Sequence, residues 1–155
     1  MQPASRTTRH AASIAKRLLL VVAALIANHV FAQATPIGLW RVIDDDTHQA
    51  TSLVRISEAG GTITGKVERL LDPAMQDARC DKCTDERKDK PIVGMTILRN
   101  AKHTGDGTWG NGDILDPDNG KVYRVRLKPL DGGKRLEVRG YLGPFYRNPQ
   151  WVREE

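Results

Sequence analysis

Short apolar runs of five to nine residues alternate with clusters of Gly, Asp, Asn and Pro from residue 36 onward, and this rhythm restricts the possible folds most strongly. Runs of that length are typical of β-strands. No window of eleven residues keeps the i, i+3, i+4, i+7 apolar spacing of an amphipathic helix. The sequence therefore predicts a nearly all-β domain. The eight expected strands cover residues 38–43, 51–57, 62–71, 92–99, 108–115, 121–129, 135–142 and 150–153.

Turn sequences separate several of these strands. Residues 59–61 (Ala-Gly-Gly), 117–120 (Pro-Asp-Asn-Gly) and 131–133 (Asp-Gly-Gly) contain residue types that accept the positive φ angles of tight hairpins. Strands that follow one another in the sequence should therefore pair antiparallel. Eight short strands connected in this way predict a small antiparallel barrel or sandwich with one wet and one dry face.

Two stretches depart from this rhythm. Residues 72–90, about nineteen in number and rich in Asp, Lys and Arg, separate the third and fourth expected strands. Loops of this length are uncommon and are often functional or held by a covalent link. Asp72 followed by Pro73 predicts a helical turn at its start, because aspartate caps and proline favours the first helical position. Residues 143–149 are unlike a regular strand, so the last hairpin is expected to be irregular.

The N-terminal segment has the pattern of a secretory signal. An unbroken apolar run at residues 18–27 follows a stretch with four cations and no acid. The run is about half of the ~20 residues that a membrane-spanning helix needs, so a cleavable signal is favoured over a stable membrane anchor. Small residues permit cleavage after Ala34, which we favour, or after Ala32. We expect a signal peptide at residues 1–34 and one domain at 35–155, exported to the periplasm or secreted.

The predicted signal peptide also accounts for most of the net charge of +5. Residues 35–155 contain 20 basic and 19 acidic side chains and no basic run. Binding to a phosphate backbone requires clustered positive charge. The domain is therefore not expected to bind nucleic acid.

Several short motifs follow one another in a set order. They are Gly38-Leu39-Trp40, Cys80-Asp81-Lys82-Cys83, residues 88–94 (KDKPIVG), 112–117 (GDILDP), 120–123 (GKVY), 138–141 (VRGY) and Trp151. In this combination they resemble the secreted bacterial proteins grouped as the domain of unknown function 2147 family, over residues 38–153. The resemblance implies an all-β, lipocalin-like, up-and-down barrel of about eight strands, with one long charged loop between strands 3 and 4. It implies no established activity.

Lipocalins begin their first strand with Gly-x-Trp, as Gly38 and Trp40 do here, and place an arginine of the last strand across the tryptophan. The resemblance implies that Arg153 occupies that position. A guanidinium stacked on an indole ring closes the end of the barrel through a cation–π contact. A purely structural role for Trp40 as a core aromatic residue is compatible with this interpretation.

Cys80 and Cys83 are the only cysteines of the chain. In an exported protein a neighbouring pair is expected to be oxidised, and a disulfide within the long loop is the favoured interpretation. Redox catalysis would need the pair at a helix N-terminus in a βαβ unit. A zinc site would need two further ligands, and the histidines of the domain, His48 and His103, fall in expected turns. We therefore predict neither a metal nor a cofactor.

The polar residues give little support for catalysis. Three aspartates at 44–46 and the acidic stretch 116–120 lack the glycine and glutamate spacing of a calcium loop, so we interpret them as turns. The domain has no Gly-x-Ser-x-Gly nucleophile. Acids such as Glu68 and Glu137 could form a glycosidase pair if their strands were neighbours, but surface charges explain them equally well. An enzyme is thus the least favoured class.

Two functions remain, and they differ in whether the barrel is hollow. In the first, aromatic side chains line or close a cup for a small apolar molecule. The candidates are Trp40, Trp109, Tyr123 and Tyr141. In the second, the barrel is filled and the Cys80/Cys83 loop contacts a protein of the cell envelope. A continuous apolar cavity of a few hundred Å³, open at one end, would favour the first.

Overall fold

The computed structural model describes residues 34–154, so the predicted signal peptide, apart from Ala34, lies outside the described residues. Within this range no helix is long and apolar enough to cross a membrane. The elements in chain order are β1 (Gly38–Ile43), β2 (Ala50–Ala59), β3 (Thr62–Leu70), the 3-10 helix η1 (Pro73–Met75), β4 (Thr96–Gly105), β5 (Thr108–Asp116), β6 (Lys121–Leu130), the 3-10 helix η2 (Asp131–Gly133), β7 (Arg135–Leu142), β8 (Phe145–Arg147) and β9 (Gln150–Arg153).

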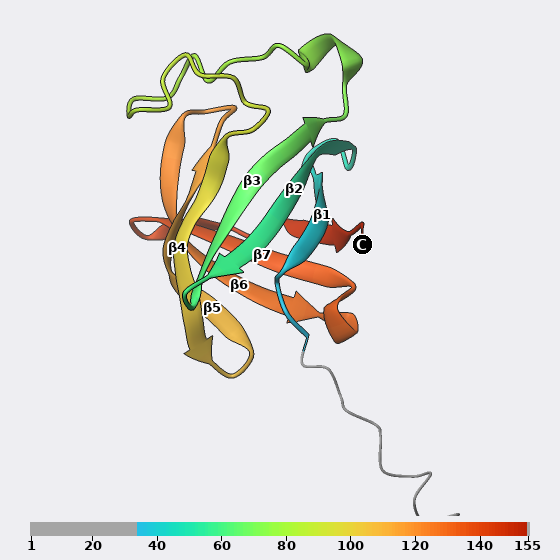
Figure 1. Ribbon diagram of the computed structural model, residues 1–155, viewed down its shortest axis with the longest axis vertical. Coiled ribbons are helices and arrows are strands. Elements are labelled where there is room, and N and C mark those ends of the chain that lie inside the picture. The colour runs from blue at the N-terminus through green and yellow to red at the C-terminus, as the bar shows by residue number, and fades with distance from the viewer. Residues whose placement is uncertain (1–33, 155) are drawn as a thin grey trace, which may run out of the picture. The chain divides into compact units, whose positions relative to one another are not determined.

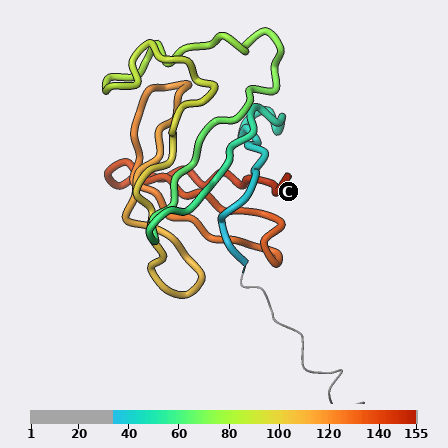
Figure 2. The backbone as a smooth tube through the Cα atoms, viewed as in Figure 1, coloured from blue at the N-terminus to red at the C-terminus, as the bar shows by residue number. Residues whose placement is uncertain are grey.

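The strands form an antiparallel barrel that closes on itself (Figures 1 and 2). Each strand from β1 to β7 pairs with the next one along the chain. The ring is completed because β7 pairs with β9 and β9 pairs with β1. The predicted all-β, up-and-down barrel is therefore confirmed, and closure pairs the two outer strands that an open sheet would expose.

The eighth position of the ring is shared by β8 and β9. Both pair with β7 in one continuous register, so they are a single strand interrupted at residues 148–149. Pro149 explains the interruption because it has no N–H to donate, although its carbonyl still accepts from the Val138 amide at 2.9 Å. The stretch expected to be irregular thus contains a regular strand over Phe145–Arg147.

The fourth strand lies further along the chain than the sequence pattern predicts, at Thr96–Gly105 instead of residues 92–99. Ile92 and Met95 are buried, but they lie in a turn. Gly94 adopts a φ of 86° there, and its amide donates to the Val67 carbonyl at 2.7 Å. The apolar run at 92–95 therefore docks the long β3–β4 connection on the core and does not extend the strand.

One end of the barrel interior is densely packed. We call it the packed end; it contains the N-terminal half of β1 and the β2–β3 and β4–β5 hairpins. The side chains there that are at most 1 % exposed include Trp40, Val54, Ile56, Ile63, Leu98, Leu127 and Leu136. Packing of this density supplies most of the hydrophobic stabilisation that a small barrel can obtain.

The inward side chains become smaller toward the other end, which we call the open end. On β1 the inward position changes from Trp40 to Val42, which is half-buried. On β7 it changes from Leu136 to Gly140. Four connections lie at this end: the β1–β2 loop, the β3–β4 connection, the β5–β6 turn and the β7–β8 turn. Smaller side chains on a ring of fixed diameter leave unfilled volume.

Candidate ligand cavity

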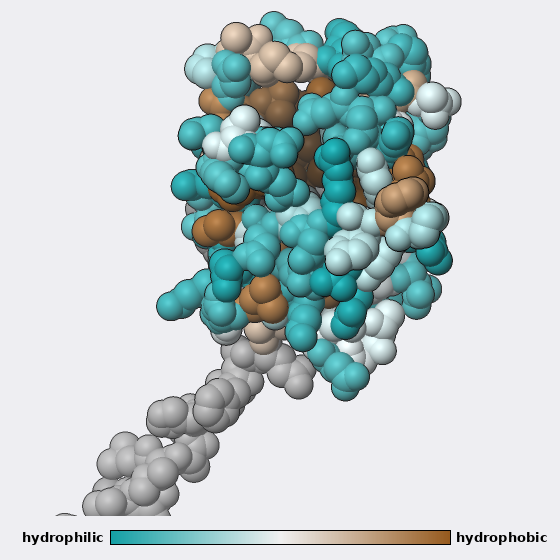
Figure 3. All heavy atoms as spheres, turned by 180° about the vertical axis from the view of Figure 1, so that it is seen from behind, coloured by the Kyte–Doolittle hydropathy of each residue, from teal (hydrophilic) through white to brown (hydrophobic). Residues whose placement is uncertain are grey.

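A cavity of about 650 Å³ occupies the open end of the barrel. Every position of the ring contributes to its wall. From β1 to β7 and then β9, the contributing side chains include Val42, Ser52, Val67, Ile97, Ile114, Tyr123, Val138 and Trp151. Figure 3 shows apolar atoms in a recess between hydrophilic side chains in the upper part of the molecule. The wall is therefore mainly apolar, and the volume lies in the range of small-molecule sites.

A glycine in the wall makes room for an aromatic ring. A Cβ at Gly140 would lie 3.1 Å from the Cβ of Tyr123, which stands on the neighbouring strand β6. The Tyr123 hydroxyl accepts a hydrogen bond from the Asn119 side-chain amide at 3.1 Å. Gly140 thus permits a close approach, which is a common reason for glycine inside a strand.

Six aspartates border the mouth of the cavity. They are Asp44, Asp45, Asp46, Asp72, Asp116 and Asp118. Within residues 34–154, Arg147 is the one cationic side chain among those lining the cavity. The aspartates come from the β1–β2 loop, the β3–β4 connection, and the end of β5 with the turn that follows it, so the mouth is acidic on several sides.

Two of these aspartates organise the turns that carry them, as the sequence predicts for turn residues. The Asp44 carboxylate accepts from the Thr47 amide and from the Thr47 hydroxyl, each at 2.7 Å. These bonds lower the pKa of Asp44. The Asp116 carboxylate accepts from the Asp118 amide at 3.0 Å and from the Asn119 side chain at 2.7 Å. The turn-forming residues therefore also set the charge of the mouth.

Asp118 lies where these like charges converge. Partial desolvation among the loops raises its pKa, and the carboxylates of Asp116 and Asp44 act in the same direction, whereas Lys82 opposes them. Asp118 retains an exposed surface in spite of the surrounding protein. Asp44 and Asp118 come from different connections, so the mouth concentrates negative charge that is separated in sequence.

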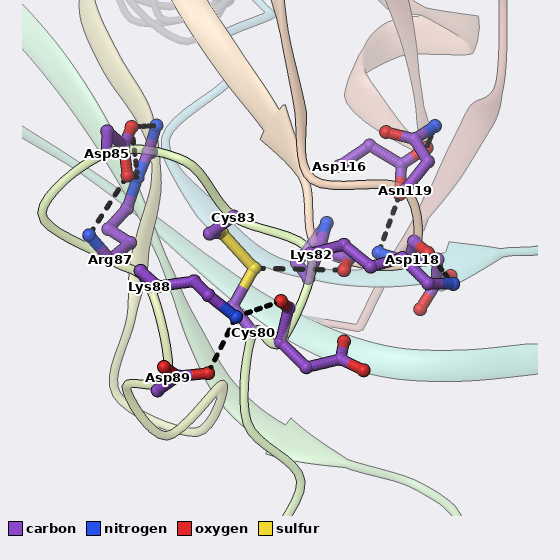
Figure 4. The surroundings of a disulfide bond; sticks show 12 residues. Cys80, Lys82, Cys83, Asp85, Arg87, Lys88, Asp89, Asp116, Asp118 and Asn119 are labelled. Carbon is purple, nitrogen blue, oxygen red and sulfur yellow. Dashed lines mark hydrogen bonds and ion pairs between the residues drawn. A yellow bond between two sulfur atoms is a disulfide. The ribbon is translucent and has the colours of Figure 1, made fainter.

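The cysteine pair secures the long connection against the rim (Figure 4). Cys80 and Cys83 are joined in a disulfide, and both are buried. Lys82, between them, donates from Nζ to the Asp118 carbonyl at 2.8 Å. A Cβ at Gly120, whose φ is 71°, would lie 2.0 Å from the Lys82 carbonyl oxygen, so the β5–β6 turn requires glycine at the contact. Neither cysteine lines the cavity itself.

A buried arginine holds the rest of the connection. Arg87 is ion-paired with Asp85 and donates from its guanidinium to the Thr96 carbonyl at the start of β4, at 3.2 Å. Hydrogen bonds from Arg87 lower the pKa of Asp85 to about 2. The connection is therefore attached both to the β5–β6 turn and to β4.

The packed end is closed by the last strand. The guanidinium carbon of Arg153 lies 4.2 Å from the centre of a Trp40 ring. Among the described residues, the same guanidinium donates to the carbonyl groups of Thr35 at 2.7 Å, Ile37 at 3.0 Å and Gly133. Arg153 thereby connects the first strand, the last strand and η2, in the arrangement that the lipocalin resemblance implies.

The structure corrects the aromatic lining expected from the sequence. Tyr123 lines the cavity, but Trp40, Trp109 and Tyr141 do not. Trp40 is completely buried at the packed end. Tyr141 lies on the outer face of β7, with its ring centroid 6.2 Å from that of Tyr146. Aromatic character alone does not distinguish inner from outer positions.

Trp109 and His103 form a contact of their own. Trp109 is half-buried against the core, and its ring meets His103 edge-on at a centroid distance of 4.9 Å. His103 therefore lies in strand β4 and not in the expected turn. His48 does lie in a turn, the β1–β2 loop, with a φ of 57°.

The acids considered for catalysis are far apart in the ring. Glu68 on β3 is paired with Arg55 at 3.0 Å, and Glu137 on β7 is paired with Arg139 at 3.5 Å. β3 and β7 are not neighbouring strands. Within the described range, no group of three or more His, Cys, Asp or Glu side chains is close enough to hold a metal ion. The arrangement at the open end can therefore enclose a molecule but presents no evident reacting pair.

Comparison with known proteins gives two matches. The model of a bacterial family, DUF2147, described as "Uncharacterized protein conserved in bacteria", matches residues 38–153. Among solved structures, protein HP1028 from the human pathogen Helicobacter pylori, which is reported to belong to the lipocalin family, is similar with a TM-score of 0.66 and 17% identity. That match covers 77% of this chain and 82% of the other. No curated protein sequence matches. The structural likeness shows the fold, in agreement with the family resemblance.

Proposed function

The chain belongs to the DUF2147 family, and from its lipocalin-like barrel we propose that it is an exported protein that binds a small apolar molecule in the open-end cavity. The observation that carries this proposal is the continuous cavity of about 650 Å³ with an apolar wall. The pattern of a cleavable signal in the sequence supports export to the periplasm or beyond.

Energetics support binding of this kind. Each methylene group that leaves water contributes about 0.8 kcal/mol. An alkyl chain of about ten carbons therefore gains roughly 8 kcal/mol before the cost of immobilisation is subtracted. The hydroxyl groups of Ser52 and Tyr123 provide hydrogen-bonding groups in the mainly apolar wall. The proposed role is binding without catalysis.

The alternative function, an envelope-interaction module that acts through the Cys80/Cys83 loop, has weaker support. It assumes a filled barrel, whereas a cavity lies at the open end. The central side chain of the loop, Lys82, is engaged with the Asp118 carbonyl of the neighbouring turn. We therefore assign the loop to support of the cavity rim.

The proposal is tested by titrating the mature protein with a neutral fluorescent probe, N-phenyl-1-naphthylamine. We expect fluorescence enhancement that saturates at a micromolar probe concentration. Ser52→Phe fills part of the cavity and should weaken binding by about 200-fold, because about four methylene equivalents lose their site. Ser57→Phe is the matched control, since Ser57 lies exposed on the same strand.

Thermal unfolding of both variants checks that they are folded, and Val42→Phe offers a second way to fill the cavity. Native mass spectrometry of protein exported under natural conditions should show a bound molecule. The proposal is overturned if the wild-type protein neither binds the probe nor carries a ligand, or if Ser52→Phe and Val42→Phe bind as tightly as the wild type.

A further inference from the structure

We propose that the preferred ligand of the cavity is a cationic amphiphile, with its apolar part inside the barrel and one positively charged head group at the mouth. This inference rests on the proposed function and specifies the ligand class. The observation that supports it is the combination of a mainly apolar wall with a mouth whose charged groups are mostly negative.

The charge balance of the mouth is strongly negative. Six aspartates border it, and the lining residues within 34–154 include one cation, Arg147. Arg147 lies 3.7 Å from the Asp116 carboxylate, so its charge is partly offset. Two further groups with positive character face the aspartates from outside the lining: Lys82 acts on Asp118, and His48 acts on Asp44. The acidic groups remain in excess after these groups are included.

The negative charges also repel one another across the mouth. Asp44 on the β1–β2 loop and Asp116 at the end of β5 both disfavour ionisation of Asp118, which is also partly desolvated. A cation placed between these connections would reduce the repulsion, whereas an anionic head group would increase it. The negative electrostatic potential at the mouth therefore favours a ligand with a cationic head group over one with an anionic head group, even where their apolar parts bind the wall equally well.

An organic cation fits the arrangement better than a metal ion. The aspartates are distributed around the mouth, and no metal-binding group forms among the described residues. Several of their oxygens already accept hydrogen bonds within their own turns, as in Asp44 with Thr47. A diffuse negative field above an apolar cavity suits a bulky charge attached to an alkyl or aromatic body.

The test compares three probes that share a twelve-carbon chain and differ in the head group: dodecylammonium, dodecanol and dodecanoate. Each displaces N-phenyl-1-naphthylamine from the mature protein at neutral pH and low ionic strength, below its micelle concentration. We expect the dissociation constant to increase in the order ammonium, alcohol, carboxylate. The ammonium and carboxylate probes should differ by about tenfold or more, and added salt should reduce the difference.

A charge-neutral variant locates the effect. Asp44→Asn/Asp118→Asn removes two charges and retains an oxygen acceptor at each position, so the turns can keep their hydrogen bonds. It should reduce the ammonium preference, measured as the ratio of the dodecanol and dodecylammonium dissociation constants, several-fold. The matched control is Glu58→Gln/Asp106→Asn, which removes two exposed acids from hairpins of the packed end and should leave the preference unchanged.

The possible outcomes separate the two proposals. If all three probes bind with similar affinity, or dodecanoate binds most tightly, the cationic preference is overturned while binding of apolar molecules stands. If none of the three displaces the naphthylamine and that probe itself does not bind, both proposals fail. An ammonium preference that the Asp44/Asp118 variant and the control variant retain equally also overturns the assignment to the mouth.

Discussion

The packed end and the open end of this barrel are built from the same strands, yet one is filled and the other is hollow. On β2 the inward residues Val54 and Ile56 fill the packed end, whereas Ser52 lines the cavity. The pairing of β2 with β1 is continuous from Ser52 to Ile56, whereas its pairing with β3 shifts register between Leu53 and Val54. Small side chains at inward positions therefore leave space for a cavity at one end of the closed barrel, and large side chains fill the other end.

The two ends are also closed differently. At the packed end Arg153 stacks on Trp40 and donates to the carbonyl groups of Thr35, Ile37 and Gly133. At the open end a disulfide-linked connection supports the rim from outside and leaves the cavity interior free. Closure by a core contact gives stability, and support from the periphery is compatible with a site that a ligand enters.

The largest expected difference between the ends concerns the core. Ile56→Ala at the packed end should lower the free energy of unfolding by about 4 kcal/mol, because it removes buried methyl groups and creates a void. Ile97→Ala in the cavity wall should cost about 2 kcal/mol, because the space beside it is already unfilled. Equilibrium denaturation in urea measures both values. Equal losses would show that the open end is as tightly packed as the other.

The second comparison removes one arginine from each end. Arg153→Met should cost about 2–3 kcal/mol through loss of the cation–π contact and several hydrogen bonds. Arg147→Met should cost less than ~1 kcal/mol, because its side chain is 67% exposed and its ion pair with Asp116 is long. Thermal unfolding under matched conditions compares them. A cost for Arg147→Met as large as that for Arg153→Met would contradict the proposed closure.

The third comparison between the two ends concerns the disulfide between Cys80 and Cys83. Its reduction should lower stability by about 2 kcal/mol, since the covalent loop between Cys80 and Cys83 is short. Amide hydrogen exchange should accelerate at the β5–β6 turn, residues 116–120, and remain slow at η2 on the packed end. Reduced wild-type protein and the Cys80→Ser/Cys83→Ser variant should agree. Uniform acceleration at both ends would instead indicate global destabilisation.

The smallest effect is a dependence on acid. The folded state holds the pKa of Asp85 at about 2, below its ordinary value of 3.8, through hydrogen bonds from Arg87. The pair therefore stabilises the fold above about pH 4, and this contribution, about 1 kcal/mol, is lost as the pH falls toward 2. Asp85→Asn should be less stable than the wild type at neutral pH and equal to it near pH 2. A constant difference across that range would exclude the pair as the cause.

The hairpin pattern and the family motifs were sufficient to predict the barrel and most of its strands. The position of β4 was not predictable from the local pattern. The apolar side chains of Ile92 and Met95 pack the β3–β4 connection against the core and do not belong to a strand. Three of the four aromatic lining candidates were misplaced: Trp40 is inward but lies at the packed end, and Trp109 and Tyr141 lie on strands whose inward faces the sequence did not identify. The faces of β5 and β7 depend on register, which includes an irregularity between Trp109 and Gly112 on β5.

Within the candidate site, too, the sequence predicted some features of the acidic mouth and not others. The sequence identified residues 44–46 and 116–120 as turns, and turns occur at residues 45–47 and 117–120, with Asp116 as the last residue of β5. A decrease in residue size along an expected strand, from Trp40 to Val42 or from Leu136 to Gly140, was the available signal of a hollow end. This decrease in side-chain size indicates a cavity only when the closed ring shows that the small side chains lie at the same height along the barrel axis.

By itself the sequence determined the all-β class, the hairpin order and the composition of the turns, because these depend on the alternation of residue types and on local backbone preferences. Only the tertiary structure decided which inward residues share one cavity and which aspartates meet at its mouth. These relations join residues as distant in the chain as Asp44 and Asp118, and they arise when β9 pairs with both β1 and β7 and the barrel closes.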